Sequence, residues 1–406
     1  MTVSNLTPEL FLKARKNISS YVRKTPLIPF DFLNRENGRN VLLKCENMQV
    51  TGSFKIRGAT NCVVENMAKA KKAGVIAASA GNHAQGVAAI CSMLGIRATI
   101  VMPTMTPVIK IQNTKRWGAE TVLEGSVYNE SFDHAMKLAE AKGYLFVHPY
   151  RDEQVIAGQG TIGLELLEDP LFESCEAIII PIGGGGLISG ISKVLKAKKK
   201  NLKVYGVTAE SAPATYKSYK SGQILSQAPS FTLAEGVATK TTDETMLKRI
   251  QDSVDDVFSI SENSIAHAIA LLAEHGKILA EGSAALSVAA ILEGSVPEKN
   301  VTALISGGNI DLPALGHVLQ HGLAHQGRLV RLLITITDRP GGLNKVTEVL
   351  GQVGANIIQI FHQRATLHTK IGEANIEVDI ESKGHDHTGE IIQELTKRGF
   401  KVNRVD

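Results

Sequence analysis

The stretch 178–195, IIIPIGGGGLISGISKVL, runs from an apolar segment through four glycines into a segment with apolar residues at helical spacing. This order predicts a buried strand, a tight turn and a helix. Such a passage is typical of α/β folds, in which helices cover a mainly parallel sheet. A tight turn alone would need one or two glycines. Four of them, Gly183–Gly186, favour a phosphate-binding loop, because they leave the amides at the helix start open to an anion.

The same alternation of strands and helices extends from about residue 40 to residue 310. Ala-rich helical patterns separate the apolar runs, and several runs lead directly into glycine-rich turns, where open α/β sheets bind ligands. The predicted strands are 41–46, 74–80, 97–103, 119–125, 145–149, 177–184, 203–210 and 302–308. We therefore expect an α/β fold with open, mainly parallel sheets.

The C-terminal part of the chain has a different pattern. From Arg328 onward the sequence reads as strand, helix, strand, strand, helix, strand. This βαββαβ order predicts a ferredoxin-like module. The segment 316–328, GHVLQHGLAHQGR, is rich in Gly and His, and we place the domain boundary within it, between residues 325 and 326.

Charge and hydropathy exclude several classes of partner. The formal net charge of +4 is spread along the chain, and the densest basic run, 196–203, follows a predicted helix as a solvated C-terminal end. We expect no nucleic-acid partner. No apolar run is long enough to span a bilayer, and residues 1–18 lack the apolar core of a signal peptide. The four cysteines are far apart, which suits a reducing compartment. These features predict a soluble cytoplasmic protein without a membrane partner.

Three more small-residue motifs follow predicted strands or open predicted helices: TGSFKIRGA at 51–59, SAGNHAQG at 79–86 and SGGN at 306–309. In the first motif Lys55 lies between an aromatic residue and a basic one, an unusual setting for a surface lysine. In the second, Ser79 and its neighbours are either an ordinary cap and turn or a set of donors for a carboxylate.

The four motifs together resemble those of the fold-type II pyridoxal 5′-phosphate (PLP) enzymes, above all the threonine ammonia-lyases, also called threonine/serine dehydratases. The resemblance covers nearly all of residues 1–325 and includes AEGSAALSVAA at 280–290. The C-terminal residues, with TDRPGGL at 337–343, resemble an ACT domain. The resemblance implies a two-lobed PLP-dependent catalytic domain over 1–325, with a smaller lobe at roughly 50–155, and a regulatory ACT domain over 326–406.

The resemblance also implies a role for each matching residue. Lys55 forms a Schiff base with PLP and, once displaced by the substrate amine, acts as general base toward the Cα proton. The expected cofactor-binding residues are Lys55, Phe54, Asn82 (against the 3′-oxygen), Gly183, Gly184, Gly185, Gly186, Leu187 and Ser306 (against the pyridine nitrogen). The expected substrate carboxylate loop is Ser79, Ala80, Gly81, Asn82 and His83. Glu281 is expected near the active centre without an assigned role.

The expected reaction is the deamination of threonine, and of serine to a lesser extent, to an α-keto acid and ammonia by β-elimination. A neutral Ser306 at the pyridine nitrogen is consistent with elimination. Serine racemases carry a second serine at the position of Ala80, which has no proton to give, so racemisation is disfavoured. Serine racemase or serine dehydratase activity, β-replacement, and a non-catalytic amino-acid-binding protein are the alternatives.

Three further expectations rest on the resemblance alone. The effector loop of the ACT domain corresponds to Asp338, Pro340, Gly341 and Gly342, with isoleucine or valine as the effector class. Relatives bind a cation through a glutamate matching Glu210 and a carbonyl near Ala214. Their next ligand, an aspartate, is Tyr216 here, which favours a monovalent cation over a divalent one. Relatives form homodimers or homotetramers, and we expect the same.

Overall fold

The computed structural model describes residues 6–364 and 370–405. Its contacts divide the chain into two compact units, Met1–Ile310 and Asp311–Asp406. The predicted boundary between residues 325 and 326 stays a prediction, since the helix before it groups with the second unit.

The larger sheet of the first unit has the strand order β1-β2-β10-β7-β8-β9. Its strands are β1 (Leu27–Pro29), β2 (Asn40–Cys45), β7 (Ala177–Pro181), β8 (Lys203–Ala209), β9 (Asp256–Ile260) and β10 (Asn300–Ile305). Only the pairing of β1 with β2 is antiparallel. The central strands are buried along nearly their whole length, as the near-continuous apolar runs predict.

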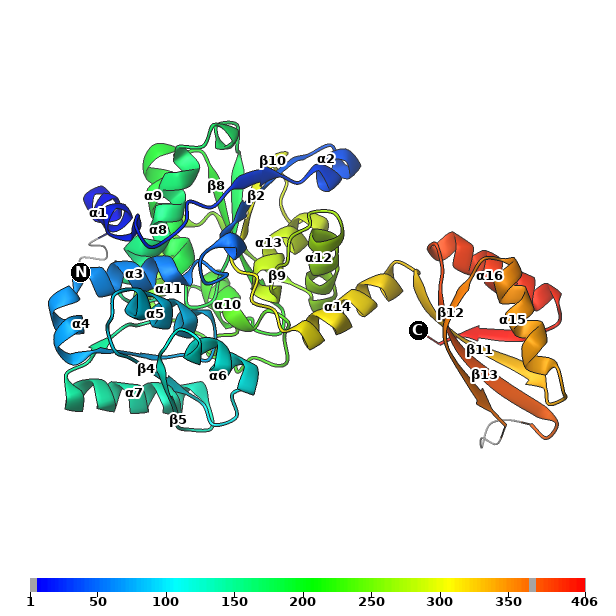
Figure 1. Ribbon diagram of the computed structural model, residues 1–406. Helices are drawn as coiled ribbons and strands as arrows, with labels where there is room; N and C mark the ends of the chain where they lie inside the picture. Colours follow the sequence, from blue (N-terminus) through cyan, green and yellow to red (C-terminus); the bar gives the residue numbers. More distant parts are fainter. Residues whose placement is uncertain (1–5, 365–369, 406) are drawn as a thin grey trace. The chain divides into compact units, whose positions relative to one another are not determined.

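The smaller sheet has the strand order β5-β4-β3-β6 and is parallel throughout. Its strands are β3 (Val75–Ala78), β4 (Ala98–Met102), β5 (Glu120–Leu123) and β6 (Leu145–Phe146). Helix α5 (Asn82–Met93) packs on the face that carries Val75 and Ala77, and α7 (Tyr128–Lys142) packs on the opposite face. The cyan part of Figure 1 shows this layer, together with α4 (Met67–Ala73) and α6 (Val108–Lys115).

Three helices cross closely because glycines line their contacts. Helix α8 (Glu153–Leu167) lies between α3 (Lys55–Glu65) and α9 (Gly186–Lys198). A Cβ atom on Gly158 of α8 would lie 2.6 Å from the Cα of Gly58 on α3, and one on Gly190 of α9 would lie 2.9 Å from the backbone nitrogen of Gly160. Helix α8 therefore fixes the spacing between the helix that begins at Lys55 and the helix that follows the four glycines.

The remaining helices cover the larger sheet or cap the unit. Helix α1 (Pro8–Ile18) begins after Thr7, whose hydroxyl accepts a hydrogen bond from the amide of Leu10. Helix α13 (Gly282–Leu292) is almost wholly buried against β7, β8 and β10. The others are α2 (Asp31–Asn37), α10 (Ala214–Ser221), α11 (Glu244–Ser253) and α12 (Glu262–Glu274), with short 3₁₀ turns η1 (Glu46–Met48), η2 (Pro170–Phe172) and η3 (Glu235–Val237).

The second unit contains the predicted βαββαβ module. After α14 (Leu312–His325) come β11 (Leu329–Thr337), α15 (Gly342–Gln352), β12 (Asn356–Gln363), β13 (Glu373–Glu381), α16 (His385–Lys397) and β14 (Lys401–Arg404). The sheet is antiparallel in the order β12-β13-β11-β14. Helices α15 and α16 cover one face of the sheet (Figure 1). Alternate residues of β11, such as Leu332 and Ile334, belong to the core on this face.

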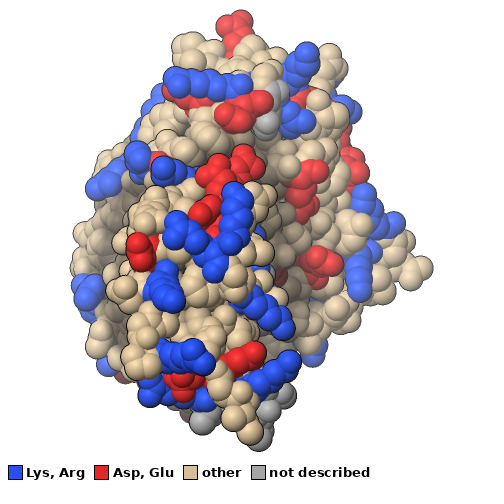
Figure 2. Space-filling model, turned by 90° about the vertical axis from the view of Figure 1, so that its right-hand side faces the viewer, with Lys and Arg blue, Asp and Glu red and all other residues tan. Residues whose placement is uncertain are grey.

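All eight predicted strands are present, so the expected fold class is confirmed. Strands β1 and β9 were not predicted, because one is short and the other mixes polar with apolar residues at the sheet edge. The four cysteines are buried free thiols. In the described part of the chain, no helix is long and apolar enough to cross a membrane. Basic and acidic side chains are interspersed on the face drawn in Figure 2.

Candidate active site

Lys55 lies where two of the sequence motifs meet. The TGS turn before it pairs with the residues after β10: the amide of Phe54 donates to the carbonyl of Ser306 at 3.1 Å, and Ser53 forms a β-bridge with Gly307. Gly52 has φ +71°, and a Cβ atom there would lie 2.4 Å from Oδ1 of Asn309. The fold therefore brings the motif 51–59 into contact with the motif 306–309, about 250 residues later in the chain. They meet at the carboxyl end of the larger sheet, where open α/β sheets bind ligands.

The amine of Lys55 has little to stabilise its positive charge. Its Nζ donates to the carbonyl of Pro149 at 3.2 Å and lies 5.2 Å from the centre of the Phe54 ring. Burial lowers the pKa of Lys55 to about 8, although the carboxylate of Glu281 opposes the shift. A neutral, nucleophilic amine is therefore accessible close to neutral pH.

The glycine loop between β7 and α9 packs tightly against Tyr150. A Cβ atom on Gly184 would lie 2.5 Å from the Tyr150 ring, and one on Gly186 would lie 2.7 Å from its carbonyl oxygen. Gly185 has φ +92°, which side chains rarely tolerate. Packing alone thus explains several of the glycines, so their number is weaker evidence for a phosphate than the sequence suggests.

The amides at the start of α9 carry the stronger argument. The first-turn N–H groups of Gly186, Leu187 and Ile188 have no acceptor within the helix, because α9 begins at Gly186. The side chain of Leu187 is buried in the core of the larger sheet. Leu187 can therefore contact a ligand through its backbone amide. Thr215 anchors the loop by donating to the carbonyl of Gly183 at 3.1 Å. This arrangement is a ready anion site.

The turn 79–83 joins β3 to α5 and is held by Glu281. The Asn82 amide nitrogen donates to both carboxylate oxygens of Glu281, at 2.8 and 2.9 Å, while its oxygen accepts from Asn309 at 2.8 Å. Ser79 accepts from the amide of Gly81 at 3.2 Å, and the helix itself is capped by Gly81 rather than by Ser79. The turn therefore presents backbone amides near the amine of Lys55, with the Asn82 side chain directed into a hydrogen-bond chain.

The imidazole of His83 points into the protein and holds the turn in place. Its Nε2 lies 2.9 Å from the carbonyl of Val147, which can only accept, so Nε2 carries the proton. Burial, with the charge of Lys55, lowers the pKa of His83 to about 3, and the ring is neutral. Burial likewise lowers the pKa of His148 to about 4, with Arg151 and Lys55 adding to the shift.

Sequence reasoning missed the segment that closes the site from the other side. Residues 147–150 follow β6 and supply the carbonyls of Val147 and Pro149 and the ring of Tyr150, the partners described above. It also gave no role to Glu281 or Asn309. These residues follow predicted strands or a motif, and this position was the available signal for a place at the site. Their partners are distant in sequence, so the contacts themselves could not be predicted.

The expected cation residues lie at the end of β8 and the start of α10, and the expected effector residues belong to the second unit. Glu210 is exposed at the end of β8, and Ala214 is buried at the start of α10. No group of three His, Cys, Asp or Glu that could hold a metal occurs within the described ranges. Asp338, Pro340, Gly341 and Gly342 form the turn from β11 to α15, where Asp338 pairs with Arg364 at 3.3 Å.

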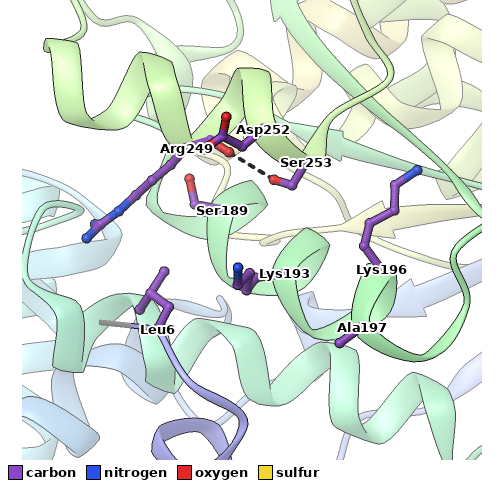
Figure 3. Close-up of a pocket in the computed structure, with 8 residues that line it drawn as sticks. All are labelled: Leu6, Ser189, Lys193, Lys196, Ala197, Arg249, Asp252 and Ser253. Carbon is purple, nitrogen blue, oxygen red and sulfur yellow. Dashed lines mark hydrogen bonds between the residues drawn. The ribbon is translucent and has the colours of Figure 1, made fainter. Parts of the chain in front are cut away.

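A cavity of about 270 Å³ lies between α9 and α11 (Figure 3), and its lining contains none of the predicted site residues. Ser189 and Lys193 of α9 line one side, and Arg249, Asp252 and Ser253 of α11 line the other. Arg249 is paired with Glu153 at 2.9 Å and Lys196 with Asp255 at 2.6 Å. Two of the cationic side chains that line the cavity are therefore already in ion pairs.

The residues around Lys55 fit PLP. The chain offers an amine of low pKa for the aldehyde, free helix-start amides for the phosphate, and Ser306, which is 2% exposed, at the end of β10 beside Phe54. The hydroxyl of Ser53 and Nδ1 of His83 are buried without a hydrogen-bond partner among the described residues. Polar groups with unmet hydrogen bonds beside the amine are what a bound polar ligand would satisfy.

Comparison with known proteins gives two family matches. The family described as pyridoxal-phosphate dependent enzyme matches residues 18–307, and the ACT domain matches residues 330–400. The L-threonine ammonia-lyase of Thermotoga maritima is 40% identical over 401 residues, which cover 98% of this chain and 100% of that protein. The enzyme of the same name from Geobacter sulfurreducens is 38% identical, over 97% of this chain and 98% of that protein.

Solved structures give the same relationship for the first unit. A crystal structure of a threonine deaminase superposes with a TM-score of 0.71 at 37% identity, covering 75% of this chain and 99% of that one. A maize serine racemase superposes with a TM-score of 0.72 at 30% identity, covering 79% and 98% respectively.

Proposed function

Because the chain belongs to the pyridoxal-phosphate-dependent enzyme family and ends in an ACT domain, we propose that it is a threonine ammonia-lyase. It would convert L-threonine to 2-oxobutanoate and ammonia by elimination of the β-hydroxyl as water, followed by hydrolysis. The observation that carries the proposal is the match along nearly the whole chain to L-threonine ammonia-lyases, with the Lys55 amine poised for the cofactor.

Lys55 would perform the two proton-dependent steps. The bound cofactor supplies an electron sink that stabilises negative charge at the substrate Cα. Lys55 would hold the cofactor through its neutral amine, and the same amine, when free, would be the base that takes the substrate Cα proton at Nζ. The lowered pKa serves both steps, because each needs the amine without its proton.

The surrounding residues would bind and orient. The amides of Gly186, Leu187 and Ile188 at the start of α9, with the glycine loop 183–186, hold the phosphate. The amides of the turn 79–83 would bind the substrate carboxylate. Phe54, Asn82 and Ser306 would hold the cofactor, with Asn82 for its 3′-oxygen and Ser306 for its pyridine nitrogen. Tyr150 packs on the glycine loop and fixes its distance from Lys55.

A racemase is the second candidate, since serine racemases superpose on the first unit. Racemisation needs an acid on the face of the cofactor opposite Lys55. Ala80 lies in the turn between β3 and α5 and has no proton to give. We therefore rank elimination above racemisation.

The test is a substrate assay on purified protein with PLP. Keto-acid release from L-threonine and L-serine is measured with a coupled dehydrogenase, D-serine by chiral chromatography, and cofactor binding by visible absorbance. We expect keto acid from threonine and absorbance that Lys55→Ala removes. Formation of D-serine as the main product would establish the racemase. Absorbance without keto acid would leave β-replacement, and no absorbance would favour an amino-acid-binding protein.

We further propose effector control through the ACT domain, with isoleucine or valine as the ligand at Asp338, Pro340, Gly341 and Gly342. Gly341 has φ +87° and caps α15, so the turn exposes amides at a helix start. Titration calorimetry of the full chain with each amino acid, beside threonine kinetics, tests this. Inhibition by isoleucine would place the enzyme in isoleucine biosynthesis, and unchanged heat and kinetics would refute the control.

We also propose a monovalent cation near Glu210 and the carbonyl of Ala214, a homodimer or homotetramer, and a cytoplasmic location. The cation is tested by comparing activity in potassium with activity in a bulky ammonium salt, and the assembly by sedimentation. The location rests on the four free thiols, which suit a reducing compartment.

A further inference from the structure

Glu281 is a half-buried carboxylate that contacts the turn 79–83, and the proposed reaction gives it no part. It directly precedes α13, and its amide donates to the carbonyl of Gly307 at 3.1 Å, so the backbone is fixed to the end of β10. The side chain reaches the start of α5, where both oxygens accept from the amide of Asn82. Three separate elements thus converge on one carboxylate.

The chain leaves room for this side chain. A Cβ atom on Gly307 would lie 2.8 Å from Oε1 of Glu281, and one on Gly236 would lie 3.7 Å from the same atom. At Gly307 an alanine would therefore press on the carboxylate. The glycine in the SGGN motif serves Glu281 as well as the turn.

Few charged groups in the described part of the chain act on the carboxylate of Glu281. The charged groups that act on it are Lys55 from α3, Glu235 from η3 and Lys110 from α6, and the latter two are paired with each other. Burial raises the pKa of Glu281 to about 7, although Asn82 and Lys55 oppose the shift. The other titratable groups that feel Lys55, His83 and His148, have lowered pKa values and are neutral near pH 7.

Glu281 also determines how Asn82 faces the site. The Asn82 nitrogen donates to Glu281, its oxygen accepts from Asn309, and Asn309 in turn donates to the carbonyl of Thr51 at 2.8 Å. An amide held at both ends cannot flip without losing a hydrogen bond. This chain of contacts leads back to the turn that carries Lys55.

From this geometry we propose that Glu281 is a positioning residue that orients the Asn82 amide and, through the contacts that lead from Asn82 to the turn before Lys55, acts on the Lys55 amine. The proposal rests on the proposed function, since Lys55 is there the cofactor-binding lysine. The ionised carboxylate of Glu281 favours the protonated form of Lys55, and the neutral carboxyl group does not. The two groups therefore titrate as a pair.

The test measures Lys55 in the cofactor-free protein. The rate of acetylation of Lys55 by acetic anhydride is followed against pH by peptide mass spectrometry, which reports the neutral amine without any turnover. We expect the Glu281→Gln profile to lie at lower pH than that of the wild type, because the carboxylate no longer holds a proton on Lys55. Glu281→Asp keeps the negative charge, so its labelling profile should stay closer to that of the wild type. The shorter side chain moves the carboxylate away from Asn82, so kcat/KM for threonine should fall.

Glu293→Gln is the matched control, because Glu293 lies at the opposite end of the same helix and contacts Ser261. Its labelling profile should equal that of the wild type. Identical profiles for wild type and Glu281→Gln would overturn the proposal. If Glu281→Gln fails to fold by circular dichroism, Glu281→Asp decides by the same pair of readouts, and unchanged kcat/KM there would also overturn it. Failure of the wild type to bind PLP would instead refute the proposed function, since the labelling needs no cofactor.

Discussion

Lys55 and Arg57 are two basic residues two positions apart on α3. Their surroundings differ, because carboxylates stabilise the charge of Arg57 and none contacts the amine of Lys55 among the described residues. An α-helix turns about 100° per residue, so their side chains leave the helix on different sides. Arg57 is 0% exposed, with Nε donating to Glu46 at 2.8 Å and Nη1 to Glu165 at 2.6 Å. Burial alone would lower the pKa of Arg57, but the two carboxylates more than offset it and raise the pKa. Lys55 has one carbonyl within hydrogen-bond reach and a pKa of about 8.

The difference shows what decides whether a buried cation is structural or reactive. Carboxylates in direct contact hold the guanidinium charged and make it an anchor for α3, α8 and the segment at Glu46, whereas a lone carbonyl leaves the Lys55 amine able to lose its proton. Lys44, bonded to Glu165 at 2.6 Å, extends the structural cluster. The cluster around Arg57 thus fixes the helix that begins at Lys55.

The largest expected effect is that of Lys55→Ala. Removing the amine should lower threonine deamination by at least about a thousandfold, because the covalent attachment and the base are lost together. Thermal unfolding of the cofactor-free protein should stay near that of the wild type. Lys137→Ala, at an exposed position of α7, is the control and should keep full activity. An unfolded Lys55→Ala protein would mean that Lys55, too, is structural.

Arg57→Ala should have the opposite character. It leaves Glu46 buried without its cation and leaves Glu165 paired with Lys44 alone, which costs about 3–5 kcal/mol of the free energy of unfolding. Urea unfolding of the cofactor-free protein measures this loss. The double variant Glu46→Gln with Arg57→Met removes charges of both signs and should recover part of it. A stability loss below about 1 kcal/mol, the range of surface pairs, would show that the cluster is no anchor.

The pH dependence of PLP attachment should show a smaller effect. Only the neutral amine reacts, so the rate of cofactor binding to the apoprotein should rise about tenfold per pH unit below the Lys55 pKa and level off above pH of about 8. The sign follows from burial, which lowers the pKa of a cation. Stopped-flow absorbance from about pH 6 to about pH 10 gives the profile. A rate still rising at the upper end of that range would place the amine in an ordinary solvated setting.

The smallest effect is expected for Thr161→Val, which removes the hydroxyl that accepts from Nη1 of Arg57 at 3.2 Å. The loss of this hydrogen bond to a charged group, together with the one that the hydroxyl donates to the carbonyl of Gly158 at 2.6 Å, should cost about 2–3 kcal/mol in urea unfolding. Thr60→Val is the matched control, because the Thr60 hydroxyl is buried on α3 without a partner in the described residues. Equal losses for the two variants would show that packing, not the charge cluster, explains the change.

The sequence predicted what depends on local pattern. Lys55 at a helix start, the strand–glycine–helix passage at 183–187 and the βαββαβ module are all readable from spacing and composition. The partners of Arg57 were not predictable in this way, since Glu46 and Glu165 are ordinary acidic residues until the fold brings them to it. The same holds for Pro149 and Tyr150, which meet Lys55 and the glycine loop through long-range contacts alone.

The glycine loop illustrates a further limit. Four consecutive glycines favoured a phosphate site, yet Tyr150 and the φ of Gly185 require glycine for packing and conformation as well. A run of glycines can therefore reflect packing and backbone conformation as well as a binding role. Conversely, Glu281 carries no pattern of its own, and its place between Asn82 and Gly307 emerges only in three dimensions.

The most direct test of the central claim, that Lys55 is the reactive cation and Arg57 the structural one, is to reduce the PLP-loaded protein with borohydride and sequence the modified peptide by mass spectrometry. The account predicts a pyridoxyl group on Lys55, at one group per chain. It should be found in the tryptic peptide CENMQVTGSFKIR, because trypsin does not cleave after a modified lysine. A pyridoxyl group on another lysine, with Lys55 unmodified, would contradict the account.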